Sequence, residues 1–189
     1  KAHRERALDR LAWVYEQQRD FSGALRIWHE MPGEMRAARA GTAAHYLCEL
    51  AEQALLQGEL DRVRTLLAEA RSHDPDSARA SLLAARVARR TGTPDEARMA
   101  WRQVFLARPM LQAVFMDEAL AGADAQQRRE FLAAVSGPHA LRRAADTVAG
   151  RFRCGSCGLE SVAWQWRCPS CRNWDTLAIA GVSEQRVSG

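Results

Sequence analysis

The sequence predicts a mainly α-helical protein, in which an array of helical hairpins is followed by a small metal-binding ribbon. Glycine, proline and large apolar residues recur 34 positions apart in the helical part, and four of the five cysteines fall within 18 consecutive residues near the end of the chain. The composition, with 47% hydrophobic and 26% charged residues, is typical of a folded domain. Ala, Leu, Arg and Glu are abundant, which favours helices.

The repeat appears as three pairs of positions with the same spacing. These pairs are Gly58 with Gly92, Leu67 with Trp101, and Pro75 with Pro109. The period is that of the tetratricopeptide repeat, a pair of helices joined by a turn. An ordinary helical bundle is the alternative, but amphipathic helices require only spacings of three or four residues and not recurring Gly and Pro. We therefore predict a tetratricopeptide-repeat helical solenoid.

Three units fit this template in order along the chain. The first covers residues 8–32, and its positions precede those of the second unit by 39 residues, so about five residues are inserted between them. The second and third units cover residues 44–75 and 81–109. Trp28 and Trp101 fall at packing positions of their units, and we expect both to be buried.

Beyond residue 109 the pattern becomes looser. Residues 111–121 and 126–135 are predicted to form one more helical pair, with Gly122 as a helix breaker, and residues 139–148 a short helix. The expected domains are therefore tetratricopeptide repeats over 1–109, a degenerate repeat and helical connector over 110–150, a metal-binding ribbon over 151–181 and a flexible tail over 182–189.

The first helix of each hairpin in such an array usually lines a concave surface that binds a partner. Aromatic and arginine side chains dominate interface energetics, so this surface is suited to an acidic or extended peptide. A solvated helix face is the alternative for each position. The predicted partner-binding residues are Arg6, Trp13, His45, Glu52, Arg79, Arg86 and Arg89.

The clustered cysteines form two Cys-x2-Cys knuckles with ten residues between them. Two residues between cysteines allow both thiolates to reach one ion, and two such knuckles make a closed tetrahedral site. The predicted ligands are Cys154, Cys157, Cys168 and Cys171. Residues 159–166 alternate in β-prone side chains and are predicted to form a ribbon strand. A redox pair is disfavoured because no βαβ pattern surrounds the knuckles, and the clustered pairs are typical of a metal site in a reducing compartment, not of a secreted disulfide framework.

No catalytic constellation is apparent. The five histidines are scattered, no glycine-rich phosphate loop occurs, and a closed four-thiolate site has no open position for a substrate. Cys48 stands alone and is expected to be an inert apolar residue. The net charge of +4 is not concentrated in a basic tail, so nucleic acid is a disfavoured partner. The sequence thus predicts a protein that is not an enzyme and has no small-molecule substrate.

Helical repeats followed by a Cys-x2-Cys-Gly … Cys-Pro-Ser-Cys-Arg-x-Trp ribbon resemble the lipopolysaccharide assembly protein B (LapB/YciM) family of Gram-negative bacteria. Residues 152–174 carry the specific part of this resemblance. It implies a rubredoxin-like ribbon holding one metal ion. The ten residues between the knuckles, and Arg172 where rubredoxins usually have a second glycine, leave zinc and iron both open.

The resemblance also implies a function. Members of the family are adaptors that work with the membrane protease FtsH to promote degradation of the deacetylase LpxC, and they contact other inner-membrane proteins of lipopolysaccharide assembly. They lie on the cytoplasmic face of the inner membrane through an N-terminal anchor that this sequence lacks. Two other functions stay open at this point: electron transfer by a tetrathiolate iron centre, and nucleic-acid binding by a zinc ribbon.

Overall fold

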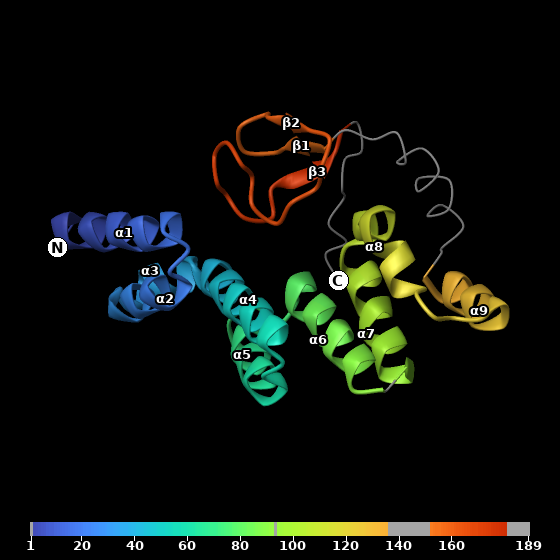
Figure 1. The fold of residues 1–189 in the computed structure, drawn as a ribbon. Coiled ribbons are helices and arrows are strands. Elements are labelled where there is room, and N and C mark those ends of the chain that lie inside the picture. The colour runs from blue at the N-terminus through green and yellow to red at the C-terminus, as the bar shows by residue number, and fades with distance from the viewer. Residues whose placement is uncertain (1, 93, 136–151, 181–189) are drawn as a thin grey trace. The chain divides into compact units, whose positions relative to one another are not determined.

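A computed structural model describes residues 2–92, 94–135 and 152–180 of the chain (Figure 1). It divides into two compact units, residues 1–103 and 104–189, which are described separately below. The described residues are mainly helical, with a small β-ribbon near the C-terminus, as the sequence predicts. The helices are α1 (Ala2–Gln17), α2 (Phe21–Glu30), α3 (Gly33–Ala38), α4 (Ala40–Gln57), α5 (Leu60–His73), α6 (Ala78–Arg90), α7 (Pro94–Ala107), the 3₁₀ turn η1 (Pro109–Leu111), α8 (Gln112–Ala119) and α9 (Ala125–Val135).

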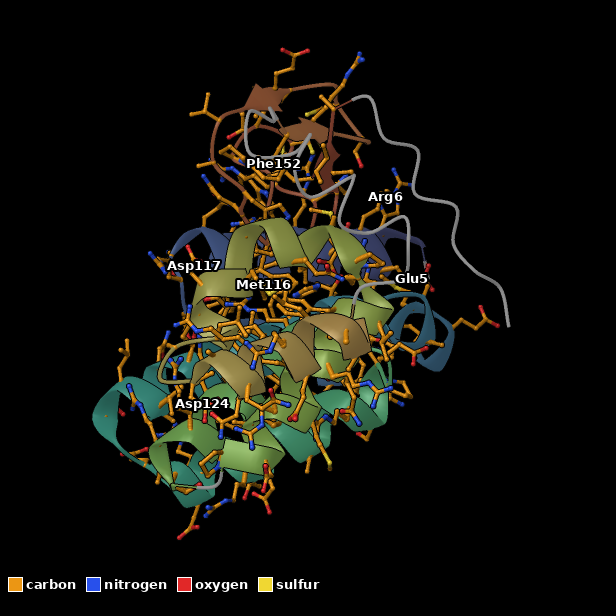
Figure 2. The ribbon with its side chains drawn as sticks, turned by 90° about the vertical axis from the view of Figure 1, so that its right-hand side faces the viewer. Glu5, Arg6, Met116, Asp117, Asp124 and Phe152 are labelled. Atoms are coloured by element: carbon orange, nitrogen blue, oxygen red, sulfur yellow. The ribbon has the colours of Figure 1, made fainter. Side chains whose placement is uncertain are left out.

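The first hairpin joins α1 to α2 through a tight turn. Asp20 caps α2 by accepting a 2.8 Å hydrogen bond from the backbone N–H of Gly23. A Cβ atom at Gly23 would lie 2.5 Å from the ring of Tyr15, so only glycine allows α1 and α2 to approach this closely. Arg6 lies on the solvent-exposed side of α1 (Figure 2).

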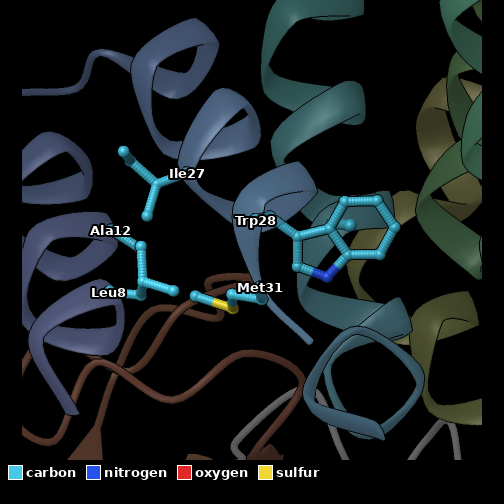
Figure 3. Close-up of a cluster of buried hydrophobic side chains, with 6 residues drawn as sticks. Leu8, Ala12, Ile27, Trp28 and Met31 are labelled. Atoms are coloured by element: carbon cyan, nitrogen blue, oxygen red, sulfur yellow. The ribbon is translucent and has the colours of Figure 1, made fainter. Parts of the chain in front are cut away.

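The core of the first hairpin is a cluster of apolar side chains from α1, α2 and α4 (Figure 3). Trp28 is its largest member and is only 6% exposed, as its repeat position predicts. The His73 ring at the end of α5 meets the Trp28 ring edge-on, with 4.8 Å between centroids. The cluster therefore ties the first hairpin to the second. Its buried members are Leu8, Ala12, Ile27, Trp28, Met31 and Ala43.

The turns between paired helices explain the recurring glycines. Gly58 follows α4 and Gly92 follows α6, with φ angles of 80° and 79°. This left-handed conformation closes a helix at little cost only for glycine. The 34-residue spacing therefore marks the same turn in two successive helical hairpins, α4–α5 and α6–α7. The residues inserted between the first and second units form the short helix α3.

The helical part of the second unit contains the end of α7, η1, α8 and α9. The rings of Phe105 and Phe131 meet edge-on at 6.1 Å and link α7 to α9. The buried Gln112 side chain donates a 3.3 Å hydrogen bond to the carbonyl of Val135 and so caps the end of α9. The helices α8 and α9 correspond to the looser helical pair expected after residue 109. The predicted helix over 139–148 lies outside the described residues.

None of the helices in the described parts of the chain combines the length and the apolarity that crossing a membrane requires.

Candidate metal centre

The ribbon is a three-stranded antiparallel sheet in the order β2-β1-β3. Its strands are β1 (Phe152–Cys154), β2 (Glu160–Ser161) and β3 (Leu177–Ile179). The central strand β1 pairs with β2 through Arg153 opposite Glu160, and with β3 through Cys154 opposite Leu177. The sheet thus places the first knuckle directly after its central strand.

The predicted strand over 159–166 is wrong in extent, because β2 ends at Ser161. The Ser161 hydroxyl donates a 2.7 Å hydrogen bond to the carbonyl of Ala163 and accepts one of 3.2 Å from its N–H. This local turn competes with strand pairing. The rings of Trp164 and Trp166 instead meet edge-to-face, with 4.4 Å between their centroids. The strand that completes the sheet, β3, was not predicted.

The two knuckles have the same backbone hydrogen bonds. In the first, the N–H of Gly158 donates to the Cys154 carbonyl at 2.9 Å, and the N–H of Cys154 donates to the Leu159 carbonyl at 2.8 Å. In the second, Arg172 N–H bonds to the Cys168 carbonyl at 2.9 Å, and Cys168 N–H to the Asn173 carbonyl at 3.0 Å. The site is therefore built from two copies of one turn.

The residue that follows each knuckle has a left-handed backbone. Gly158 has a φ angle of 76° and Arg172 one of 62°. Arg172 therefore adopts the conformation that glycine has in the first knuckle, although a side chain makes it costlier by about 1–2 kcal/mol. The missing second glycine does not change the shape of the site.

The four sulfur atoms converge on one point. All lie within 4.8 Å of one another, with 3.6 Å between Cys154 Sγ and Cys171 Sγ and 3.7 Å between Cys157 Sγ and Cys168 Sγ. A tetrahedral ion with metal–sulfur bonds of about 2.3 Å separates its ligand sulfurs by about 3.8 Å. The cysteines thus fit a single tetrahedral metal ion. Four thiolates are suited to zinc and to iron alike.

The environment of the sulfurs favours ionisation of the first knuckle. Burial opposes ionisation of Cys154, but hydrogen bonds with the Thr176 hydroxyl and with backbone N–H groups outweigh it and lower the pKa of this thiol to about 6. The backbone N–H of Leu159 lowers the pKa of Cys157. The N–H of Asn173 also favours the Cys171 thiolate, but burial and the three neighbouring sulfurs raise its pKa to about 12. A dication removes this mutual repulsion, so metal and thiolates stabilise each other.

These pKa values predict that metal affinity rises with pH. Above a pH of about 6 the Cys154 thiol is mostly ionised, whereas the Cys171 thiol, with a pKa of about 12, is still protonated at neutral pH. Metal binding must therefore displace the Cys171 proton into the solvent. Affinity should therefore increase at least about tenfold per pH unit from pH 7 to 9, and fall more steeply below pH 6 as Cys154 also binds a proton. Competition with a chelator of known affinity, repeated across this range, measures the slope. An affinity that does not change between pH 7 and 9 would contradict this assignment.

Contacts outside the knuckles hold the ribbon in place within the second unit. The Arg108 guanidinium forms a 3.0 Å ion pair with Asp175, and the Phe115 ring of α8 meets the Trp164 ring edge-on at 5.6 Å. The Arg167 guanidinium lies 5.5 Å from the centroid of the Trp174 ring. Sequence reasoning missed Thr176 and Asp175, and their only signal is their position shortly after the second knuckle.

The predicted partner-binding residues differ in exposure. His45 and Arg79 are 5% and 3% exposed. Arg79 of α6 forms ion pairs with Glu49 (3.0 Å) and Glu52 (2.9 Å) of α4. Arg86 is partly exposed and joins the same network, 3.1 Å from Glu52. Arg6, Trp13 and Arg89 are exposed. Part of the predicted partner surface, namely Arg79, Arg86 and Glu52, therefore lies in the contact between the neighbouring helices α4 and α6.

Cys48 does not belong to the metal site. It is fully buried in α4, and burial raises the pKa of its thiol to about 12. A thiol in this state is a poor nucleophile.

Comparison with known proteins bears on the ribbon and on the whole chain. Residues 152–178 match the family model described as a rubredoxin metal binding domain. The chain is 23% identical to lipopolysaccharide assembly protein B of Escherichia coli strain K12, over 238 aligned positions covering 90% of this chain. The proteins of that name from strains O6:H1 and O157:H7 match equally well. The resemblance to the lipopolysaccharide assembly protein B family is confirmed.

The alignment covers 61% of the length of these relatives. The family resemblance therefore extends over nearly all of this chain but over only part of each relative.

Proposed function

We propose that this chain is a non-catalytic adaptor that regulates lipopolysaccharide biosynthesis by promoting FtsH-dependent proteolysis of LpxC. Its partners would be FtsH, LpxC and other inner-membrane proteins of lipopolysaccharide assembly, met on the cytoplasmic face of the bacterial inner membrane. The similarity to lipopolysaccharide assembly protein B over 90% of the chain carries this proposal.

The chemistry of the metal centre supports an adaptor. Four cysteine sulfurs surround one point, which leaves no open coordination position for water or a substrate. An ion held in this way stabilises the ribbon and does not act as a Lewis acid toward a bound molecule. The ribbon, which follows the helical hairpins along the chain, then serves as a rigid element. We assign the hairpins to tetratricopeptide repeats.

The exposed arginines of α6 are the basic part of the proposed partner surface. Arg89 is exposed and Arg86 is partly exposed one turn away, so both can meet acidic side chains of a partner. Trp13 of α1, with 52% of its surface exposed, and Arg6 are the other accessible members of the predicted set. Glu52 belongs to the proposed surface because its ion pair with Arg86 orients that guanidinium.

We expect the double variant Arg86→Glu, Arg89→Glu to weaken binding of FtsH or LpxC at least about tenfold, because charge reversal replaces attraction by repulsion at the contact. Affinity would be measured with the purified, metal-loaded chain. Arg64→Glu with Arg71→Glu, two exposed arginines of α5, is the matched control and should bind normally.

Reversal of Arg86 also removes its ion pair with Glu52. The single variant Arg89→Glu leaves the ion pairs of Arg79 and Arg86 in place and should show part of the loss with unchanged helicity. Equal affinities for the wild type and the double variant would contradict a partner surface on α6.

A further inference from the structure

Two close pairs among the four sulfurs of the ribbon each join one knuckle to the other. Cys157 lies 3.7 Å from Cys168, and Cys154 lies 3.6 Å from Cys171, measured between Sγ atoms. In each pair one cysteine is buried, Cys168 at 1% exposure and Cys154 at 2%. The other member is exposed in the case of Cys157 and partly exposed in the case of Cys171. The more exposed cysteine of each pair is therefore the one that a small oxidant meets first, and the buried cysteine is its neighbour.

We propose that the ribbon is a peroxide-sensitive site, in which oxidation releases the metal and links the knuckles by two disulfides, Cys157–Cys168 and Cys154–Cys171. This goes beyond the proposed adaptor function, since it concerns the chemistry of the cysteines themselves. The oxidant class is a peroxide such as hydrogen peroxide, which reaches the exposed sulfur first.

The reaction balances in two steps for each pair. The Cys157 thiolate attacks one peroxide oxygen, the O–O bond breaks, and the hydroxide that leaves takes up a proton to become water, which gives a sulfenic acid. The Cys168 thiolate then attacks this sulfur, the S–O bond breaks, and a second hydroxide leaves and is protonated. Two sulfurs have together lost two electrons, and one peroxide has been reduced to two water molecules. The same steps join Cys171 to Cys154.

Links between the knuckles require little movement of the sulfurs. A disulfide needs a sulfur–sulfur distance of about 2.0 Å, so each cross-knuckle pair must close by less than about 2 Å after the metal leaves. The matching backbone turns that hold the two knuckles need not open for this movement. The two bridges would be nested, because Cys157 and Cys168 lie between Cys154 and Cys171 in the chain.

Nested bridges keep the ribbon closed without a metal. Each bridge removes conformational freedom from the unfolded chain, as the ion does in the reduced protein. The chain would then have three states: reduced with metal and ordered, reduced without metal and unfolded in the ribbon, and oxidised without metal but closed. The first and third differ in charge, because the thiolates have become neutral disulfides.

The test uses the 189-residue chain loaded with zinc, which has no redox chemistry of its own. Hydrogen peroxide is added in steps, zinc release is followed with a metal-binding dye, and the cysteine links are mapped by mass spectrometry of a non-reduced digest. We expect one zinc ion released per chain and both cross-knuckle disulfides, with Cys157–Cys168 formed first. Cys48 should remain a free thiol, and dithiothreitol with zinc should restore the starting protein.

Three outcomes would overturn the proposal: disulfides within the knuckles, oxidation to sulfonic acids without disulfides, or zinc retained with all thiols intact. Limited proteolysis adds a readout that does not depend on the metal. The oxidised chain should resist cleavage in residues 152–180, whereas the reduced metal-free chain is cut there. Rapid cleavage of the oxidised chain would also contradict closure by the cross-knuckle bridges.

Discussion

Removal of the metal, by a strong chelator or by Cys168→Ser, is expected to unfold the ribbon while the helices of both units stay folded. Among the described residues 152–180 the buried side chains are Phe152, Leu177 and two of the cysteines. Ordering the backbone costs about 1–2 kcal/mol for each residue, whereas burying one large apolar side chain contributes about 1.5–3 kcal/mol. The ribbon therefore depends on the ion for its fold.

Limited proteolysis and far-ultraviolet circular dichroism measure this result together. Protease should cut within residues 152–180 much faster after metal removal, while the helical signal changes little. Cys48→Ser is the matched control, because Cys48 is buried outside the site and its replacement should leave metal content unchanged. A metal-free chain whose ribbon stays protease-resistant under reducing conditions would show that the metal is dispensable for the fold.

Trp101→Ala is expected to lower the free energy of unfolding by about 3–5 kcal/mol, the usual cost of truncating a large buried aromatic residue. Trp101 is 1% exposed in α7 and occupies the repeat position equivalent to Leu67 of the preceding hairpin. Its loss would leave a cavity that the packed helices close only in part. Urea denaturation followed by circular dichroism gives the change directly.

Trp13→Ala is the matched control, because Trp13 is the same residue type with 52% of its surface exposed. Its free energy of unfolding should change by less than about 1 kcal/mol, as is usual for surface positions. If Trp13→Ala unfolded the helices and Trp101→Ala did not, the repeat register would be incorrect.

The helical architecture followed from the sequence because its signals are local. Gly58 and Gly92 mark turns that only a left-handed backbone can close, and that requirement recurs with the repeat. The knuckle spacing likewise brings the two thiolates of each pair to one ion without knowledge of the rest of the chain.

Features that depend on individual side-chain contacts could not be predicted in the same way. The burial of Arg79 results from Glu49 and Glu52 of the preceding hairpin, and the repeat pattern does not show which charges will pair. The strand β2 ends early because the Ser161 side chain forms a hydrogen bond with the backbone of Ala163. Both depend on side-chain geometry that periodicity cannot encode.

The ribbon's supporting residues show the same limit. Thr176 touches the Cys154 sulfur, with 3.2 Å between Oγ1 and Sγ, only because β3 pairs with β1. The strand β3 is three residues long, too short for a periodic signal. The position of Thr176 beside the metal site therefore depends on strand pairing that the sequence pattern does not indicate.

Direct binding to the proposed partners tests the central claim of an adaptor. The metal-loaded chain would be immobilised and exposed in turn to purified LpxC, purified FtsH and a DNA duplex, and each titration would be repeated after chelation. We predict saturable binding of LpxC or FtsH that is weakened by metal removal, and no saturable binding of DNA. Saturable, salt-sensitive binding of DNA without binding of either protein would contradict the adaptor function and favour a nucleic-acid-binding ribbon.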